Sequence, residues 1–92
     1  MGAGISPPVH HNMKAKVFVS LKKGVLDPQG EAILKALQSM GQKEVVSVRV
    51  GKYFEVELKN CDSPKAKQVL NQISEKLLAN TVIEDFSFQL EE

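Results

Sequence analysis

Cys61 is the one side chain in this sequence that could serve as a strong nucleophile, because the chain has no other cysteine. A catalytic thiol needs a base that removes its proton, and histidine is the usual base. The only histidines are His10 and His11, which adjoin each other in a segment without an apolar period. The sequence therefore favours an ordinary cysteine in a turn beside Asp62, and we expect no catalytic residue in this chain.

Metal and phosphate chemistry have little more support in the residue pattern. His10 and His11 would need a third and a fourth ligand to hold a metal ion. The Gly51-Lys52 pair is followed by Tyr53 and a strand pattern, whereas a phosphate-binding loop needs several glycines and opens a helix. Paired carboxylates without other ligand types indicate a solvated or interface surface. These pairs are Glu55 with Glu57, Glu84 with Asp85, and Glu91 with Glu92. We expect this chain to bind no cofactor and no metal.

The charge balance argues against nucleic acid and membrane as partners. The 12 basic and 11 acidic residues are interleaved, so no uniform field would collect a phosphate backbone or an anionic membrane. Phe18 and Tyr53 could stack bases on an open sheet face, but Glu55 and Glu57 would place carboxylates where an RNA backbone lies. An acylphosphatase-like enzyme would need an arginine-lined phosphate loop, and the single arginine, Arg49, lies in a strand pattern.

The elements that must position these residues alternate between strand and helix periods. Apolar residues alternate over 14–21, 45–50, 53–58 and 82–90, which predicts four strands. Apolar stripes predict one helix over about 28–40 and a second that starts at Ser63-Pro64 and includes Leu77. Asp27-Pro28 and Ser63-Pro64 are typical helix starts, and Gly41 is a typical helix end. A glycine turn at Gly51-Lys52 is expected to join the second and third strands into a hairpin.

This order predicts a two-layer α+β domain of the ferredoxin-like type. Its elements would run βαββαβ, with a four-stranded antiparallel sheet and both helices on one face. We expect residues 13–92 to form this single domain and residues 1–12 to be a disordered leader or an expression-tag remnant. The lone cysteine and the lack of an apolar run of about 18 residues predict a cytoplasmic protein.

The other face of the predicted sheet mixes apolar and polar side chains. Such a face is too apolar to be only solvated and too polar for a core, which suits a contact between subunits. A domain of this size buries only roughly 60% of the surface of its unfolded chain, so a second copy that covers apolar area would add stability. We expect a homodimer, or a tetramer built from dimers, whose contact includes Phe18, Tyr53 and Ile83.

Three segments of the chain resemble PurS, the small subunit of phosphoribosylformylglycinamidine synthase, the formylglycinamide ribonucleotide amidotransferase complex. The segments are Val25-Leu26-Asp27-Pro28-Gln29-Gly30, Val48-Arg49-Val50-Gly51-Lys52-Tyr53 and Leu77-Leu78-Ala79-Asn80-Thr81-Val82-Ile83-Glu84-Asp85-Phe86. Their order and spacing are similar to those of the family across residues 13–92.

The resemblance implies a non-catalytic bridging subunit in de novo purine (IMP) biosynthesis. In that family a glutaminase subunit, PurQ, releases ammonia, and a large synthetase subunit, PurL, uses ATP and magnesium to make formylglycinamidine ribonucleotide. PurS contacts both and assists assembly and ammonia transfer, so this chain would belong to an enzyme only as an accessory subunit of an ATP-dependent ligase. The resemblance implies partner contacts at Asp27, Gln29, Arg49, Lys52, Asn80, Glu84 and Asp85.

The residues alone leave a second interpretation open, a small-ligand-binding regulatory domain of the ferredoxin-like type. Ligand sites of such domains form between subunits and leave little signature in the sequence. A thermal-shift screen of amino acids and nucleotides would separate the two interpretations, because an assembly subunit should show no ligand-induced stabilisation.

Overall fold

The computed structural model describes residues 12–91, within which the chain forms three strands and two helices. In chain order these are β1 (Met13–Leu21), α1 (Pro28–Ser39), β2 (Gly51–Leu58), α2 (Ser63–Ile73) and β3 (Glu84–Glu91). A π-helical turn, η1 (Ser74–Leu78), continues α2. The predicted leader, residues 1–12, lies outside the described residues except for Asn12.

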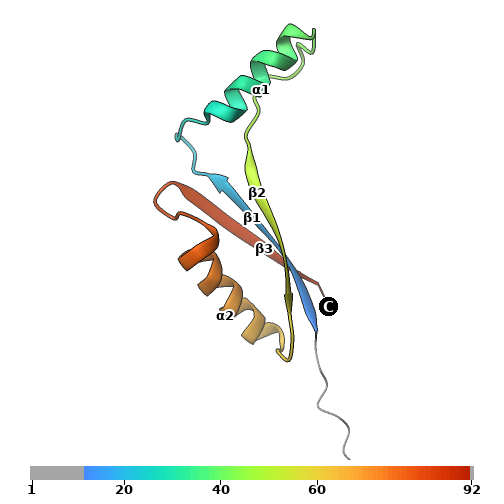
Figure 1. Cartoon of the computed structure of the whole chain (residues 1–92), viewed down its shortest axis with the longest axis vertical. Coiled ribbons are helices and arrows are strands. Elements are labelled where there is room, and N and C mark those ends of the chain that lie inside the picture. Colours follow the sequence, from blue (N-terminus) through green and yellow to red (C-terminus); the bar gives the residue numbers. More distant parts are fainter. Residues whose placement is uncertain (1–11, 92) are drawn as a thin grey trace, which may run out of the picture.

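β1 is the central strand of an antiparallel sheet with the order β2-β1-β3 (Figure 1). Val17 lies opposite Phe54 of β2 on one side and Phe88 of β3 on the other. Every second residue of β1 from Met13 to Val19 is buried, as the alternating pattern predicts, and Leu21 is partly buried. The core contains residues from this face of β1 and from the helical layer: Ala15, Val17, Val19, Leu70 and Ala79.

The prediction of a four-stranded sheet is wrong, because residues 45–50 form no strand and the described sheet has three. The expected hairpin turn at Gly51-Lys52 does not exist. These two residues pair with Ser20 and Val19, so they begin β2 rather than reverse the chain. Tight hairpin turns need a positive φ, and the glycines with positive φ are Gly24 and Gly41 instead.

The prediction that both helices cover one sheet face is also wrong for α1. Figure 1 shows α2 alongside the sheet, whereas α1 extends away from it beyond the ends of β1 and β2. The exposure of the apolar stripe of α1 agrees with this position, because Ile33 is 44% and Met40 is 73% exposed. Burial of this stripe therefore contributes little to holding α1 against the rest of the chain.

The ends of both helices follow from local chemistry. Asp27 caps α1 with its side chain, Pro28 occupies the first helical position, and Gly41 adopts φ +89° after the last turn, all as predicted. In α2 the capping side chain is Asp62, one residue before the predicted Ser63. Ser63 is instead the first residue of the helix.

The π-helical turn η1 changes which residues of the second helix face the core. Its defining hydrogen bond runs from the Ala79 N–H to the Ser74 carbonyl oxygen at 2.9 Å, which inserts one residue into the turn. Leu77, predicted to lie on the buried stripe, is 80% exposed, and Leu78 packs against the core in its place.

Candidate partner-binding surface

The residues predicted to contact partner subunits gather at one end of the sheet. β1 ends at Leu21, and its antiparallel neighbours β2 and β3 begin at Gly51 and Glu84, so all three meet at the same end. We call this region the sheet end. It comprises the ends of these strands and the loops beside them: residues 21–29, 49–52 and 80–85.

Asp27 is buried at the sheet end and connects two distant parts of the chain. One carboxylate oxygen accepts a hydrogen bond from the Gly30 N–H at 3.0 Å, and the other accepts one from the Val50 N–H at 2.8 Å. These two bonds, that of Val50 first, lower the pKa of Asp27, and the nearby Arg49 charge adds to the effect. The ionised carboxylate thereby fixes the start of α1 against the start of β2.

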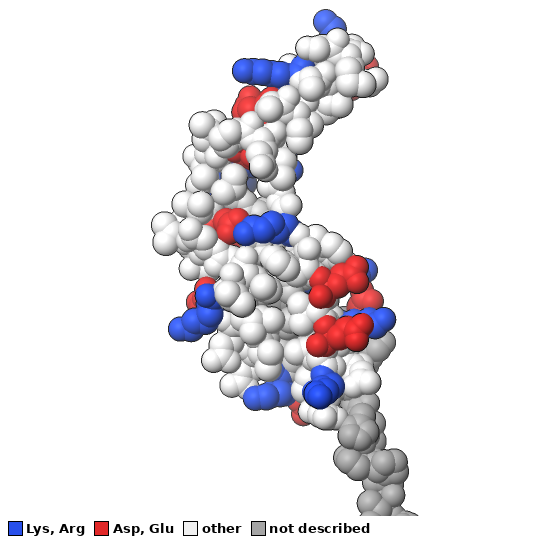
Figure 2. Space-filling model, in the orientation of Figure 1, with Lys and Arg blue, Asp and Glu red and all other residues white. Residues whose placement is uncertain are grey.

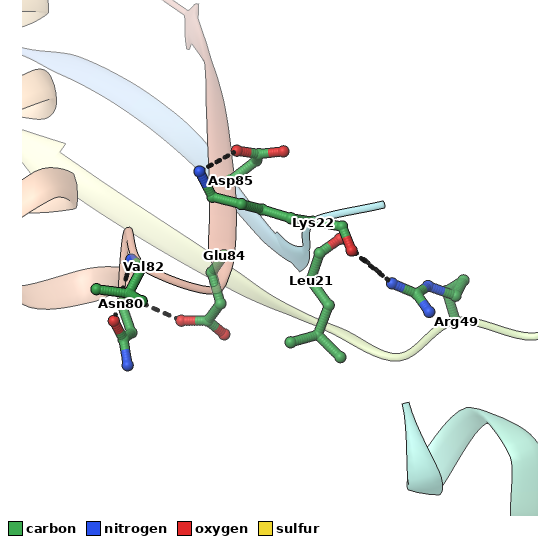
Figure 3. A network of polar contacts seen from close by, with 7 residues as sticks. All are labelled: Leu21, Lys22, Arg49, Asn80, Val82, Glu84 and Asp85. Atoms are coloured by element: carbon green, nitrogen blue, oxygen red, sulfur yellow. Dashed lines mark hydrogen bonds and ion pairs between the residues drawn. The ribbon is translucent and has the colours of Figure 1, made fainter. Parts of the chain in front are cut away.

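Arg49 makes the reciprocal connection from the segment before β2 to the loop after β1. Its guanidinium donates to the carbonyl oxygens of Val25 at 2.9 Å, Lys22 at 3.1 Å and Leu21 at 3.4 Å. Figure 3 shows the Arg49 side chain directed at the backbone of Leu21 and Lys22. The planar fork of arginine suits several acceptors at once, which the single ammonium of lysine does not.

Glu84 organises the short loop between η1 and β3. One of its carboxylate oxygens accepts a hydrogen bond from the Asn80 N–H at 2.7 Å, and the other forms an ion pair with the Lys52 ammonium at 3.5 Å. The Asn80 side-chain oxygen accepts from the Val82 N–H at 3.2 Å. Asp85, the next residue, forms an ion pair with Lys22 at 3.7 Å (Figure 3).

A cleft of about 340 Å³ opens at the sheet end between the start of α1 and the loop before β3. Four of the seven predicted contact residues line it, namely Asp27, Gln29, Lys52 and Glu84. The remaining walls are mostly apolar: Leu21, Val25, Leu26, Pro28, Val50, Gly51 and Ile83. Because Asp27, Lys52 and Glu84 already bond within the chain, the cleft offers an apolar surface with a largely satisfied polar rim.

The residues predicted for self-association fall in two places. Phe18 and Tyr53 lie on the open sheet face with their ring centres 5.4 Å apart, and they are 39% and 49% exposed. Ile83 lines the cleft instead, so the structure does not bring it together with the two rings. The Tyr53 hydroxyl donates to Glu55 at 3.3 Å, and desolvation, with the Glu55 charge, raises the pKa of Tyr53.

Charges of both signs are interspersed on the face shown in Figure 2. Lys16 and Glu91 pair at 3.0 Å across the open sheet face, and the hydrogen bond that Lys16 donates to the Glu91 carboxylate raises the pKa of Lys16. Within residues 12–91, no three His, Cys, Asp or Glu side chains gather closely enough to hold a metal ion. In the same part of the chain, neither helix has the length and apolar character needed to cross a bilayer.

Two residues with prominent positions at the sheet end were absent from the predicted contacts. Leu26 lines the cleft and is 75% exposed, and Val82 in the loop before β3 is 82% exposed. Both lie inside the segments that carry the resemblance, where we considered only polar side chains as contacts. Leu26 and Val82 could have been predicted as contacts because they are large apolar residues within the segments that resemble PurS.

Comparison with known proteins identifies the family. Residues 14–92 match the PurS family, described as phosphoribosylformylglycinamidine (FGAM) synthase. The phosphoribosylformylglycinamidine synthase subunit PurS of Bacillus subtilis (strain 168) is 51% identical over 79 residues, which cover 86% of this chain and 93% of that protein.

Solved structures agree with the sequence match. A crystal structure of B. subtilis PurS is similar with a TM-score of 0.79 at 49% identity, covering 87% of this chain and 99% of that one. A chain in the structure of PurLQS from Thermotoga maritima has a TM-score of 0.81 at 28% identity, covering 87% and 98%. These matches favour the amidotransferase subunit over the small-ligand regulatory domain, and the chain belongs to the PurS family.

Proposed function

We propose that this chain bridges a PurL-type synthetase and a PurQ-type glutaminase as the PurS subunit of phosphoribosylformylglycinamidine synthase in purine biosynthesis. The observation that carries this proposal is the match along nearly the full length of PurS chains, including a chain of the T. maritima PurLQS structure. The chain acts as an accessory subunit that assists assembly and ammonia transfer. ATP and magnesium are used by the synthetase subunit, and the complex works in the cytoplasm.

The sheet end is the proposed contact with these partner subunits. Most of its polar groups are occupied within the chain, so Asp27, Arg49 and Asn80 shape the surface rather than reach across it. The exposed Gln29 side chain and the apolar Leu26 remain available for direct contact beside the cleft. An apolar centre with a polar rim is the usual composition of a protein–protein interface.

Reconstitution tests the bridging role. Purified synthetase and glutaminase subunits are assayed for amidine formation with glutamine or with ammonia as nitrogen donor, with and without this chain. We expect the chain to raise glutamine-driven turnover strongly and ammonia-driven turnover little, because it connects the two sites without performing chemistry. Glutamine-driven turnover that is already complete without the chain would contradict the proposal.

A matched pair of charge reversals tests the location of the contact. Lys52→Glu places a second carboxylate beside Glu84 at the sheet end, whereas Lys67→Glu changes an exposed lysine on α2. We expect Lys52→Glu, and not Lys67→Glu, to weaken the restored glutamine-driven turnover, and the loss should be larger at low salt. Equal effects of the two variants would exclude the sheet end as the contact.

The open sheet face with Phe18 and Tyr53 is proposed as a contact between copies of this chain. Two half-exposed aromatic rings flanked by lysine and glutamate residues form a self-complementary surface that a twofold axis can pair with itself. Tyr53→Lys should lower the largest oligomer mass measured by light scattering, and an unchanged mass would exclude this face.

A further inference from the structure

The π-helical turn η1 lies where the second helix leads into the loop before β3 (Figure 1). Leu70 in this helix is fully buried, and a residue seven positions later returns to the same face of a regular α-helix. That residue is Leu77, but the turn contains one extra residue, so Leu78 packs against the core and Leu77 is exposed. The chain therefore carries two adjacent leucines, either of which suits the same core position.

The first residue of this turn, Ser74, is poorly satisfied. It is fully buried, and within residues 12–91 its hydroxyl has no hydrogen-bond partner. Its N–H is shared between the carbonyl oxygens of Leu70 and Asn71. In a regular α-helix this N–H donates to Leu70 alone, and a serine hydroxyl can donate to the same carbonyl oxygen. A regular α-helical turn would therefore satisfy Ser74 better than the π-helical turn does.

The loop after the turn keeps the extra residue in the helix. The Asn80 N–H donates to the Glu84 carboxylate at 2.7 Å, and the Asn80 carbonyl oxygen accepts from the N–H groups of Ile83 at 3.0 Å and Glu84 at 2.7 Å. The Lys22 N–H donates to the Ile83 carbonyl oxygen at 2.8 Å, which fixes this loop to the end of β1. If the turn became α-helical, the extra residue would enter the loop, where the exposed Val82 can move outward.

We propose that η1 is a register switch between two packed states of the second helix. In the π register, which the structure shows, Leu78 contacts the core. In the α register Leu77 takes its place, and the loop before β3 gains one residue. Each register holds one leucine in the core, so the two differ little in buried apolar area. The π register keeps the loop bonds and leaves the Ser74 hydroxyl unpaired, whereas the α register can pair this hydroxyl but disturbs the loop.

The switch connects the interior of the domain to the sheet end, because the loop that gains or loses a residue contributes Asn80 and Ile83 to that surface. A protein that binds one form of this loop would select the corresponding register of the helix. The exchange of the two leucines is a property of the chain itself and does not depend on the bridging role.

A double-mutant cycle on the isolated chain tests whether the two leucines replace each other. Leu77→Ala alone should change the ratio of folded to unfolded chain only about twofold, because this side chain is exposed in the π register. In a Leu78→Ala background the core depends on Leu77, so the same change should lower the ratio about tenfold or more. Urea unfolding at one fixed protein concentration measures both effects.

The control for this cycle is Lys76→Ala, which changes an exposed residue of the same turn and should have equal effects in both backgrounds. A fixed π turn makes the opposite prediction for the leucines. An equally small effect of Leu77→Ala in the wild type and in the Leu78→Ala chain would overturn the proposal.

NMR relaxation dispersion tests the switch in the wild-type chain, because helix register shifts occur on the microsecond-to-millisecond timescale. Exchange is expected at the methyl groups of Leu77 and Leu78 and at the amides of residues 79–83, and not at Leu70. Deleting either leucine of the pair gives the same shorter chain, whose turn can close as α-helix, so exchange at the remaining leucine should disappear. Exchange that is absent from the two leucines, or that persists in the shorter chain, would overturn the proposal. Neither experiment needs a partner subunit, so failure here is distinct from failure of the bridging role.

Discussion

The carboxylate of Asp27 and the backbone N–H of Val50 are joined at 2.8 Å across a sequence separation of 23 residues. The same carboxylate caps α1 through Gly30. One side chain therefore sets both where the helix starts and where the returning chain enters β2. The position of α1 relative to the sheet therefore depends on Asp27 more than on packing.

Replacing Asp27 with alanine should destabilise the fold more than the equivalent change at the second helix. Asp62 caps α2 through a single hydrogen bond to the Lys65 N–H at 3.0 Å, and losing such a cap costs about 1 kcal/mol. Asp27→Ala leaves two N–H groups without acceptors, so its denaturation midpoint should fall further than that of Asp62→Ala. Equal midpoints would show that the Val50 bond contributes nothing.

The stability contributed by Asp27 should depend on pH in a defined direction. The folded pKa of this carboxyl lies below its ordinary value of 3.8, first because of the Val50 hydrogen bond and then because of the Gly30 bond. Its stabilisation is fully present above pH 3.8 and is lost as the pH falls through the folded pKa. In urea titrations, the stability gap between the wild type and Asp27→Asn should be constant near neutral pH and shrink below about pH 4. A gap that widens in acid would contradict this sign.

Arg49→Lys should loosen the loop after β1 without removing the positive charge. The three carbonyl oxygens that the guanidinium reaches cannot all be served by one lysine ammonium. We expect faster amide hydrogen exchange at Lys22, Val25 and Val50, whose N–H groups donate hydrogen bonds at the sheet end, with little change in β3. Lys52→Arg, which keeps the ion pair with Glu84, is the control and should leave these three amides protected.

Leu70 and Leu77 should respond very differently to replacement by alanine. Leu70 is fully buried against β1, so Leu70→Ala should lower the unfolding free energy by about 2–5 kcal/mol. Leu77 is 80% exposed, so Leu77→Ala should change it by no more than about 0.5 kcal/mol in the isolated chain. Chemical denaturation of both variants checks whether η1 turns Leu77 away from the core.

Local signals in the sequence predicted local structure well. The alternation over 14–21 predicted the central strand, and Asp27, Pro28 and Gly41 predicted both ends of α1, because each signal depends on neighbours along the chain. The register of β2 could not be predicted in this way. A glycine between two alternating runs is typical of a turn, but Gly51 lies where a Cβ would come within 2.6 Å of the Val19 carbonyl oxygen.

The arrangement of the candidate surface was predictable only in part. The segments that resemble PurS contain all seven predicted contact residues, so their selection followed from the resemblance. Their hydrogen-bond partners did not, because the acceptors of Arg49 lie 24 to 28 residues away and are backbone carbonyls that any residue carries. The sequence pattern of α1 also could not reveal that the helix extends beyond the sheet and leaves Ile33 and Met40 of its apolar stripe exposed.

The extra residue in η1 has a consequence for comparing members of this family. A chain one residue shorter between Ile73 and Ala79 could close the turn as regular α-helix and still deliver Asn80 and Glu84 to the same loop. Alignment gaps of a single position should therefore be sought in this turn rather than in the loop that follows it. Near such a gap, two leucines that an alignment places in the same column need not face the same way in their two structures.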